Sequence, residues 1–490
     1  PSTAGSGRRR SSRTRPRCRF SSGTRDRTPA REATTGRATP CGRWPTAGST
    51  TRSAAGSTGT RSTRAGTSRT SRRWASTTPR SSPSTRRGVQ RFGDPRFAEI
   101  VAGTARWVES TLGDPAGGFG ASQDADNAPG DDGGYFTWSR RELMAALAPD
   151  DLRFATRLFG VGTDGRMPHD PERNVLFRTV SADDAATGLP AASDPARAAE
   201  RVRAALEAAR ARRPAPAVDR ALYADINGRF VAAFARAGSA LDQPVWIDRA
   251  RRAADRFLHA AYAPELGIAH RLDGARGRGY GLLEDQVAFA AGLLELAVVG
   301  ADPDYLRPAV RLLELVDREF RGEDGILRDL APRLYDGPAV GPLLEASYPL
   351  EDAPHLSANA GAALAFLRLA AVTHDPGPRA TARRLLEPIA GRLRDGGLFA
   401  AGSALGAALA GTVPVSVVVE GEGPEAARLL RAARRAWHPL AAVFAGTPPE
   451  PFALPAEVAA AGPGRAARAL VCVGDRCRPP ITDPEALAAA

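Results

Sequence analysis

The sequence predicts a mainly α-helical protein, an incomplete α/α toroid followed by a small C-terminal α/β element. Three observations support this fold class. From residue 97 onward, apolar residues recur at steps of three and four, the spacing of one face of a helix. The helical stretches come in consecutive pairs separated by loops rich in Gly, Pro and Asp. From about residue 413 onward, short β-branched runs instead surround one amphipathic helix.

The first ninety residues cannot contribute to such a core. They contain no Leu, Ile or Met and only one Val, with 21 Arg against Asp26 and Glu32. Such a segment buries too little apolar surface to offset the entropy that the chain loses on folding. We therefore expect residues 1–90 to be disordered, with an Arg-rich nucleic-acid-binding tail as an alternative. The expected domains are residues 1–90, a toroid over 91–412 and an α/β element over 413–490.

The charge of the chain is divided unequally between these parts. Residues 1–90 carry a balance of +19 and the whole chain +13, so residues 91–490 sum to −6. The body therefore has no electrostatic reason to bind nucleic acid. No uninterrupted apolar run reaches the roughly 20 residues of a membrane span, and no apolar signal region is visible. We expect a soluble cytoplasmic protein that needs no cofactor or metal, of unknown oligomeric state.

The helices of the body are expected at regular intervals. A helix at 97–112 precedes short helices at 142–147 and 154–159 and a charged helix at 195–212. The expected pairs are 227–238 with 245–259, 283–299 with 304–320, and 357–373 with 378–392, followed by a single helix at 403–409. In the last part, strands expected within 414–421, 440–446 and 468–474 accompany a helix at 424–437. Hairpins of this kind, without strands between them, are typical of toroids and bundles.

Several segments in a fixed order carry a resemblance to a known family. The segments are GGFGASQDADN, YFTWSRREL, PERNVLFR, ALYADINGRF, YGLLEDQVAF, EDAPHLSANAG and ALVCVGDRCRPPITDP. Over about residues 90–490 they resemble the thioredoxin-domain-containing proteins of the spermatogenesis-associated type. Ile226 and Gln286 stand where the family pattern has Trp and an aromatic residue, and the Pro and Gly expected before Asn359 are missing. The family's thioredoxin domain is not found in this sequence.

The resemblance implies both a fold and an activity. The helical half of the family is similar to the six-hairpin glycosidases and the N-acylglucosamine 2-epimerases, so a carbohydrate ligand is expected. Asp124 and Asp126, in a Gly-rich loop, could bind sugar hydroxyls or act as an acid/base pair. Asx turns or helix capping would explain the same loop without any ligand. Glu284 and Asp285 are catalytic candidates too, although acidic residues are also favoured at a helix start by the helix dipole.

A second polar cluster precedes the helix expected at 357–373. Asp352 and His355 lie within reach of one another as an acid/base pair, and Ser357 and Asn359 could bind a substrate. Asn227 is a further substrate-binding candidate at the start of another helix. Capping explains Ser357 and Asn227 equally well.

Two other polar features are weaker candidates. Among the histidines, His270 in the segment AHRLDG is the best additional candidate. Cys472 and Cys477 are more typical of buried thiols or of one shared hairpin than of a zinc site. Four cysteines in 490 residues fit a reducing compartment.

Residues 1–90 also allow a third interpretation, translation out of frame. In a shifted frame, residues 50–60 are compatible with YDQVGGGFHRY and residues 66–74 with WHVPHFEKM, which resemble motifs of the same family in its order. The first one or two hairpins of the toroid would then be missing. An open toroid exposes apolar helix faces to water, so we expect poor stability or aggregation.

Two function classes stay open. The first is a truncated relative of carbohydrate-active epimerases or glycosidases that is inactive in this form. The second is a non-catalytic helical scaffold that positions a thioredoxin-like redox domain on a partner. Whether the chain is an enzyme is left undecided by the sequence.

Overall fold

The computed structural model describes residues 73–74, 94–131, 133–167, 170–337, 347–353, 355–436, 438–455 and 466–489. Within residues 1–90 it describes only strand β1 (Arg73–Trp74), which pairs antiparallel with β2 (Ser122–Gln123). The expectations of disorder, of a nucleic-acid-binding tail and of a shifted frame otherwise lie outside the described residues. Among the helices of the described residues, none combines the length and the apolar character that crossing a membrane requires.

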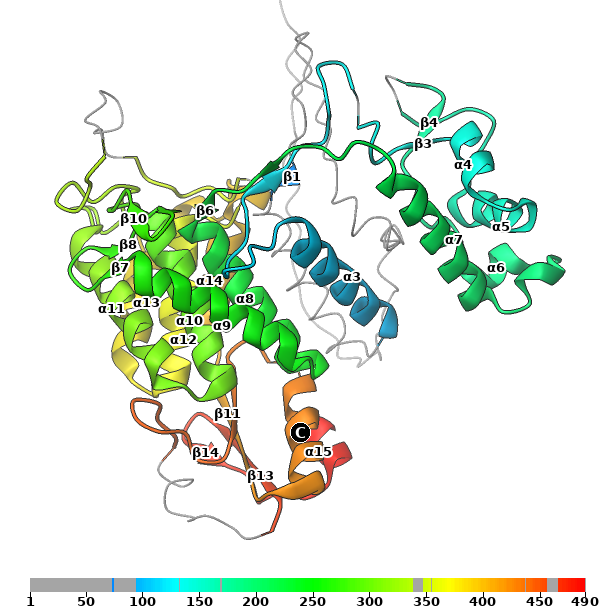
Figure 1. Cartoon of the computed structure of the whole chain (residues 1–490). Coiled ribbons are helices and arrows are strands. Elements are labelled where there is room, and N and C mark those ends of the chain that lie inside the picture. Colours follow the sequence, from blue (N-terminus) through cyan, green and yellow to red (C-terminus); the bar gives the residue numbers. More distant parts are fainter. Residues whose placement is uncertain are drawn as a thin grey trace, which may run out of the picture. The chain divides into compact units, whose positions relative to one another are not determined.

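The paired helices expected from the sequence are confirmed, and they dominate the described chain (Figure 1). Three hairpins follow one another. The first helix of the middle hairpin packs on the first helices of the other two. Their bounds are α8 (Ala224–Leu241) with α9 (Pro244–Ala260), α10 (Leu283–Gly300) with α11 (Pro303–Glu319), and α12 (Ala358–Thr373) with α13 (Pro376–Leu386). Helix α14 (Ala401–Ala410) packs on α12 and continues the series.

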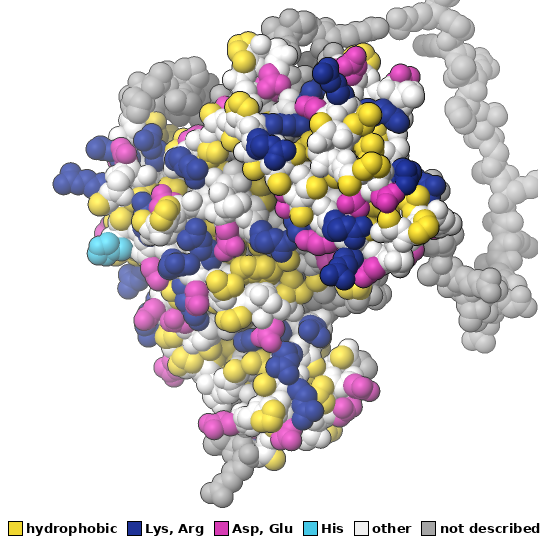
Figure 2. Space-filling model, turned by 45° about the vertical axis from the view of Figure 1, so that its right-hand side comes forward, with side chains coloured by type: hydrophobic (Ala, Val, Ile, Leu, Met, Phe, Trp, Pro, Cys, Tyr) yellow, Lys and Arg dark blue, Asp and Glu magenta, His cyan; other side chains and the backbone are white. Residues whose placement is uncertain are grey.

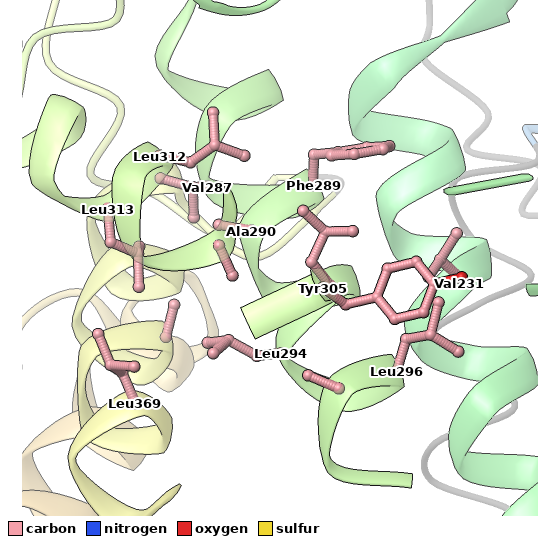
Figure 3. Packing of buried hydrophobic residues seen from close by; sticks show 14 of the residues in the cluster. Val231, Val287, Phe289, Ala290, Leu294, Leu296, Tyr305, Leu312, Leu313 and Leu369 are labelled. Atoms are coloured by element: carbon pink, nitrogen blue, oxygen red, sulfur yellow. The ribbon is translucent and has the colours of Figure 1, made fainter. Parts of the chain in front are cut away.

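Burial separates the helices of each hairpin into an inner and an outer one. Helices α8, α10 and α12 are buried over most of their surface, whereas α9, α11 and α13 bury one stripe and expose the other. Figure 3 shows Phe289 and Leu294 of α10 within this core. Residues of α8, α11 and α12, namely Val231, Leu312 and Leu369, lie around them. The sequence pattern follows from this arrangement, since an inner helix has no polar face.

Glycine allows α8 and α10 to approach closely. A Cβ added at Gly228 would lie 2.5 Å from the carbonyl oxygen of Ala288, and one added at Gly292 would meet the backbone of Gly228. Neither contact is compatible with a side chain of any size. The two inner helices therefore meet backbone to backbone at this point, which explains glycine in the interior of two long helices despite its low helix propensity.

The residues between the first helix and the first hairpin form a separate small hydrophobic core. Helix α3 (Pro95–Thr111) packs on α8 and belongs to the main core. The next four helices form a cluster of their own around residues such as Leu143, Phe154 and Leu206. They are α4 (Arg140–Ala146), α5 (Pro149–Phe159), α6 (Ala182–Ala186) and α7 (Pro195–Ala211).

The C-terminal α/β element is also confirmed. Strand β11 (Val415–Glu420) lies in the centre, parallel to β12 (Ala441–Ala445) and antiparallel to β13 (Arg468–Val473). Strand β14 (Arg476–Cys477) continues β13 as a hairpin, and α15 (Gly423–Arg435) connects β11 to β12. The chain ends in α17 (Pro484–Ala489). Phe444, Leu470 and Cys472 join the main hydrophobic core, so this element is packed on the inner helices.

The surface of the described residues agrees with two further expectations from the sequence. Arg side chains and acidic side chains interleave over the face drawn in Figure 2, as expected for a body whose charges nearly cancel. Within the described residues, α14 is followed by strand β11 rather than by an outer helix. Near it, Leu398, Phe399 and Leu405 are exposed by 86%, 46% and 38%, an apolar surface of the kind expected of an open toroid.

Candidate functional site

Three buried side-chain amides connect the inner helices to the loops before them. The amide of Asn227, near the start of α8, accepts a hydrogen bond from the N–H of Phe119 (2.8 Å) and donates to its carbonyl oxygen (3.1 Å). Gln286 of α10 forms the same pair of bonds with Ile268, at 2.8 Å each. Asn359 of α12 forms them with Leu327, at 2.9 Å each. We call these three residues the amide clamps.

The clamped residues occupy equivalent positions in their loops. Each lies eight residues after the end of the preceding helix, which is α3 for Phe119, α9 for Ile268 and α11 for Leu327. Each also pairs as a β-bridge with the residue six positions earlier, Gly113, Tyr262 and Arg321 respectively. The side-chain amide completes the hydrogen bonds of this short extended turn, and the same arrangement occurs in all three loops. Asn227 and Asn359, expected to bind substrate, thus have their amides engaged by backbone, and each is at most 1% exposed.

A charged pair lies at the N-terminal end of α10. Nδ1 of His270 lies 2.9 Å from Oδ2 of Asp285, and the other oxygen of Asp285 accepts the N–H of Asp225 (3.1 Å). The hydrogen bond to Asp285 raises the pKa of His270, and burial raises the pKa of Asp285. Asp285 is only 1% exposed, while the imidazole is 41% exposed and stacks near the ring of Tyr223. With Nδ1 held by a carboxylate, the Nε2 side of the ring can exchange protons with a ligand.

This pair continues into a second ion-pair cluster. Nη1 of Arg229 contacts Oδ2 of Asp225 at 2.6 Å, and Nη2 of the same residue contacts Glu284. Because Asp225 also donates its N–H to Asp285, the two clusters form one continuous network. The network spans the first turns of α8 and α10, where the N-terminal ends of both helices favour negative charge.

A cavity of about 290 Å³ runs along the inner helices from this network. Arg229, Glu284 and Ser357 line it at the N-terminal ends of α8, α10 and α12, and we call this end the mouth. Its middle is lined by small and aliphatic residues, namely Ala232, Ala233, Val287, Ala288, Ala291, Leu294, Leu364, Ala365, Leu405 and Leu409. Its other end, the floor, is an ion-paired triad of Arg236, Glu295 and Arg368.

The carboxylate of the floor triad is almost fully buried, while its two arginines are partly exposed. Glu295 is 5% exposed and contacts Nη2 of Arg236 at 2.7 Å and Nε of Arg368 at 2.9 Å. Burial alone would raise the pKa of Glu295, but the two guanidinium groups outweigh it and hold the pKa well below its usual range. A buried carboxylate of this kind is retained only because it is paired.

The predicted pairing of Asp352 with His355 stays a prediction. The structure shows that Asp352 has a role in holding the fold together. Its two carboxylate oxygens accept the backbone N–H of Ser357 (2.7 Å) and of Gly402 (2.6 Å). Asp352 therefore holds the starts of α12 and α14 together. Ser357 is the N-cap of α12, with its Oγ accepting the N–H of Ala360 (3.1 Å), and it also lines the cavity mouth.

Hydrogen bonds that involve backbone groups hold the Gly-rich loop with Asp124 and Asp126. The N–H of Asp124 donates to the carbonyl oxygen of Ala217 (2.8 Å), and Oδ1 of Asp126 accepts the N–H of Gly133 (2.9 Å). Neither carboxyl group is among the described residues that line the cavity. The Asx-type explanation of this loop accounts for Asp126, and a catalytic role of the pair stays a prediction.

The two C-terminal cysteines share a hairpin, as expected, but they are not free thiols. Cys472 and Cys477 lie opposite one another on β13 and β14 and form a disulfide, with their Cα atoms 3.9 Å apart. The expectation of buried thiols is therefore wrong for this pair. Sequence spacing cannot distinguish the two states, because a hairpin brings both cysteines together in either case.

Two functional elements were missed by the sequence analysis. Arg229 was not selected, although it joins the ion pairs of α8 and α10 at the mouth. Gln286 was treated only as a departure from a family pattern, but it is the central amide clamp. Arg229 lies two residues after Asn227, and Gln286 lies directly after Asp285. Residues one or two apart do not share a helix face, so helical spacing does not indicate either of them.

The described helices thus define a class of fold, an incomplete α/α toroid with a cavity along its inner helices. Spermatogenesis-associated protein 20 is homologous to this chain. The mouse protein is 27% identical over 270 residues, which cover 46% of this chain and 33% of that protein. The human protein is 25% identical over 279 residues, covering 48% and 34%. The chain thus spans about a third of the length of the curated relatives it matches.

Solved structures of two sugar-converting enzymes align with this chain. A D-mannose isomerase aligns with a TM-score of 0.32 and 14% identity, covering 65% of this chain and 74% of that one. A sugar epimerase from a ruminal bacterium aligns with a TM-score of 0.33 and 10% identity, covering 65% and 75%. No family model matches the chain.

Proposed function

We propose that this chain binds a sugar at the mouth of the cavity and that, in this form, it turns the sugar over slowly or not at all. The observation that carries the proposal is the continuous polar network from His270 and Asp285 through Asp225 and Arg229 to Glu284. Sugar hydroxyls both donate and accept hydrogen bonds, so paired carboxylates and guanidinium groups at a concave site suit them.

The division of the cavity favours its mouth as the position of the sugar. The middle of the cavity offers aliphatic walls and no hydrogen-bond partner for a buried hydroxyl group, and an unpaired buried hydroxyl is costly. At the mouth, Glu284 and Ser357 provide polar atoms. The carboxylate-supported imidazole of His270 lies in the same network beside the residues that line the cavity. A sugar isomerisation or epimerisation would need such a proton acceptor.

Calorimetric titration of the full chain with mannose, glucose and cellobiose tests this proposal. Sugar binding should be saturable, and Glu284→Gln should weaken it by about tenfold, the loss of one charge-assisted hydrogen bond. Glu265→Gln, a change at an exposed position on another loop, is the matched control and should bind as the unchanged chain does. The absence of binding to every sugar, or equal binding by the Glu284→Gln variant, would reject the proposal.

A non-catalytic scaffold for a redox partner is the second candidate function, and one observation favours it. The Cys472–Cys477 disulfide lies on the terminal hairpin of the sheet, and Cys477 is only partly buried, so a thiol of another protein can approach it. Reduced thioredoxin should then reduce the disulfide in the folded chain, as measured by thiol labelling. A disulfide that is reduced only after unfolding would speak against the scaffold. A cytoplasmic location is part of both proposals.

A further inference from the structure

A second pocket lies between the inner helices and the C-terminal α/β element. It has a volume of about 100 Å³ and is walled by the C-terminal halves of α8, α10 and α12, by α15, and by residues between α15 and β12. It shares Arg236, Glu295 and Arg368 with the floor of the large cavity. Junctions between structural elements of this kind are common places for ligand sites.

Hydrogen-bond donors dominate the wall of this pocket. Three guanidinium groups, of Arg236, Arg368 and Arg434, line it together with a single carboxylate, that of Glu295. Arg368 uses Nε and Nη2 for Glu295 and Nη1 for the carbonyl oxygen of Ala441. Among the contacts of the described residues, Arg236 makes one hydrogen bond, from Nη2 to Glu295. Its Nε–H and Nη1–H groups are therefore left for another acceptor.

Two uncharged donors complete the wall. The hydroxyl group of Ser239, one turn after Arg236 on α8, lines the pocket. His438 accepts the N–H of Leu440 at its Nδ1 (3.2 Å), so the neutral ring carries its proton on Nε2. Burial, together with Arg368, lowers the pKa of His438, which keeps the ring in that neutral, donating form near neutral pH.

The ends of the helices explain part of this arrangement. Helices α8, α10 and α15 end near the pocket, and the C-terminal end of a helix favours positive charge. The carboxylate of Asp242, at the end of α8, also acts on Arg434. These effects account for the presence of arginines.

We propose that this pocket binds a small oxyanion of the phosphate class. One water molecule occupies about 30 Å³ in the liquid, so the pocket has room for about three, which is comparable to a tetrahedral oxyanion. Guanidinium groups bind phosphate oxygens through charge-assisted N–H donors, and Arg236 has Nε–H and Nη1–H available. The anion is either free phosphate or the phosphate group of a phosphorylated small molecule.

Phosphate titration of the full chain, followed by calorimetry and thermal unfolding, tests the proposal. Sodium phosphate should raise the Tm saturably, while sodium chloride of equal ionic strength should not. Arg434→Met should weaken phosphate binding by about tenfold or more, the loss of a charge-assisted contact. Arg435→Met, the exposed neighbour on α15, should bind phosphate as the unchanged chain does. Ser239→Ala provides a milder variant, expected to weaken binding, in case Arg434→Met does not fold.

Further titrations identify the source of the anion. If glucose 6-phosphate binds more tightly than phosphate, and Arg434→Met weakens the binding of both, the anion is the phosphate group of a phosphorylated small molecule. Glu284→Gln should not change either affinity, because Glu284 lies 11 residues, roughly 16 Å, from Glu295 along α10. If phosphate binds as tightly as the sugar phosphate, the anion is free phosphate, and the pocket is then independent of the proposed sugar site. The proposal is overturned if phosphate acts no differently from chloride, or if Arg434→Met and Arg435→Met lose binding equally.

Discussion

The side-chain amide of Asn227 forms hydrogen bonds with both backbone polar groups of Phe119, a residue 108 positions earlier in the chain. A side-chain amide carries an acceptor oxygen and a donor nitrogen side by side, so it can accept from the N–H and donate to the carbonyl group of the same residue. The amide thus takes the place of a neighbouring β-strand. Gln286 and Asn359 repeat this relationship in the next two hairpins.

Replacing Asn227 with Leu should therefore destabilise the chain. Two buried backbone groups of Phe119 and the carbonyl oxygen of Tyr223 would lose their partner. Each unsatisfied buried group costs about 1–3 kcal/mol, so we expect a loss of about 3 kcal/mol or more in the free energy of unfolding, measured by urea denaturation. Gln243→Leu, at an exposed amide before α9, should change the stability by about 0.5 kcal/mol or less. Equal effects of the two changes would contradict the clamp.

The contact between α8 and α10 at Gly228 gives a second prediction. An alanine there would place its Cβ within 2.5 Å of the carbonyl oxygen of Ala288, so the helices must move apart. Overpacking of this kind costs about 1–3 kcal/mol, even though alanine is the better helix former. Gly391→Ala, where an added Cβ meets nothing within 4 Å, serves as the control and should leave the Tm unchanged or raise it slightly. A Gly228→Ala variant as stable as the unchanged chain would contradict the close contact.

The fold was more predictable than the site, and the difference has a physical cause. A long apolar stretch indicates a buried helix, so the sequence located the inner helices such as α10, whose apolar residues run all round the helix. Apolar residues at steps of three and four located the outer helices such as α11. Polar residues at helix starts do not indicate whether they are buried or what they contact. Asn227, Ser357 and Glu284 all fit N-terminal capping or dipole effects in the sequence, yet in the structure the first is a clamp, the second a cap at the cavity, and the third an ion-pair partner of Arg229.

Long-range partners are what the sequence could not supply. The oxygens of Asp352 accept from Ser357 and from Gly402, fifty residues away, and no residue near Asp352 in the sequence indicates the second contact. Likewise, Glu295 gave no signal, because a single acidic residue in an apolar helix has no local partner. Only the packing of α8 and α12 on α10 brings Arg236 and Arg368 to it.

The triad at the cavity floor predicts a pH dependence. Since the pKa of Glu295 is lowered in the folded chain, its stabilising contribution is present above the unfolded-state pKa of about 4.3 and is lost as the pH falls toward the folded-state value. Glu295→Gln should destabilise the chain at pH 7 by about 2–3 kcal/mol, because it leaves two partly exposed guanidinium groups without their carboxylate. Below about pH 4 the difference between the two chains should shrink.

Chemical denaturation of both chains from pH 3 to pH 7 measures this effect. Glu425→Gln, at an exposed position on α15, controls for the general effect of removing one carboxylate and should follow the unchanged chain. A difference between Glu295→Gln and the unchanged chain that stays constant over this range would show that Glu295 does not titrate as the triad requires.

The contact between His270 and Asp285 makes the last prediction. The hydrogen bond raises the pKa of His270 in the folded chain above the ordinary value of about 6.5. The stabilisation from the charged imidazole is therefore fully present below about pH 6.5 and is lost as the pH rises through the folded-state pKa. The buried carboxyl group acts in the same direction, since burial raises the pKa of Asp285 and makes its ionised form costly.

Replacing Asp285 with Asn should lower the pKa of His270, as measured by proton NMR of the imidazole C–H resonances. The free energy of unfolding of the unchanged chain should also fall relative to that of Asp285→Asn as the pH rises. His259, an exposed residue on α9, provides an internal control whose imidazole resonances should be the same in both chains. An unchanged pKa for His270 in the Asp285→Asn variant would mean that the contact does not exist in solution, and the network at the cavity mouth would lose its proton acceptor.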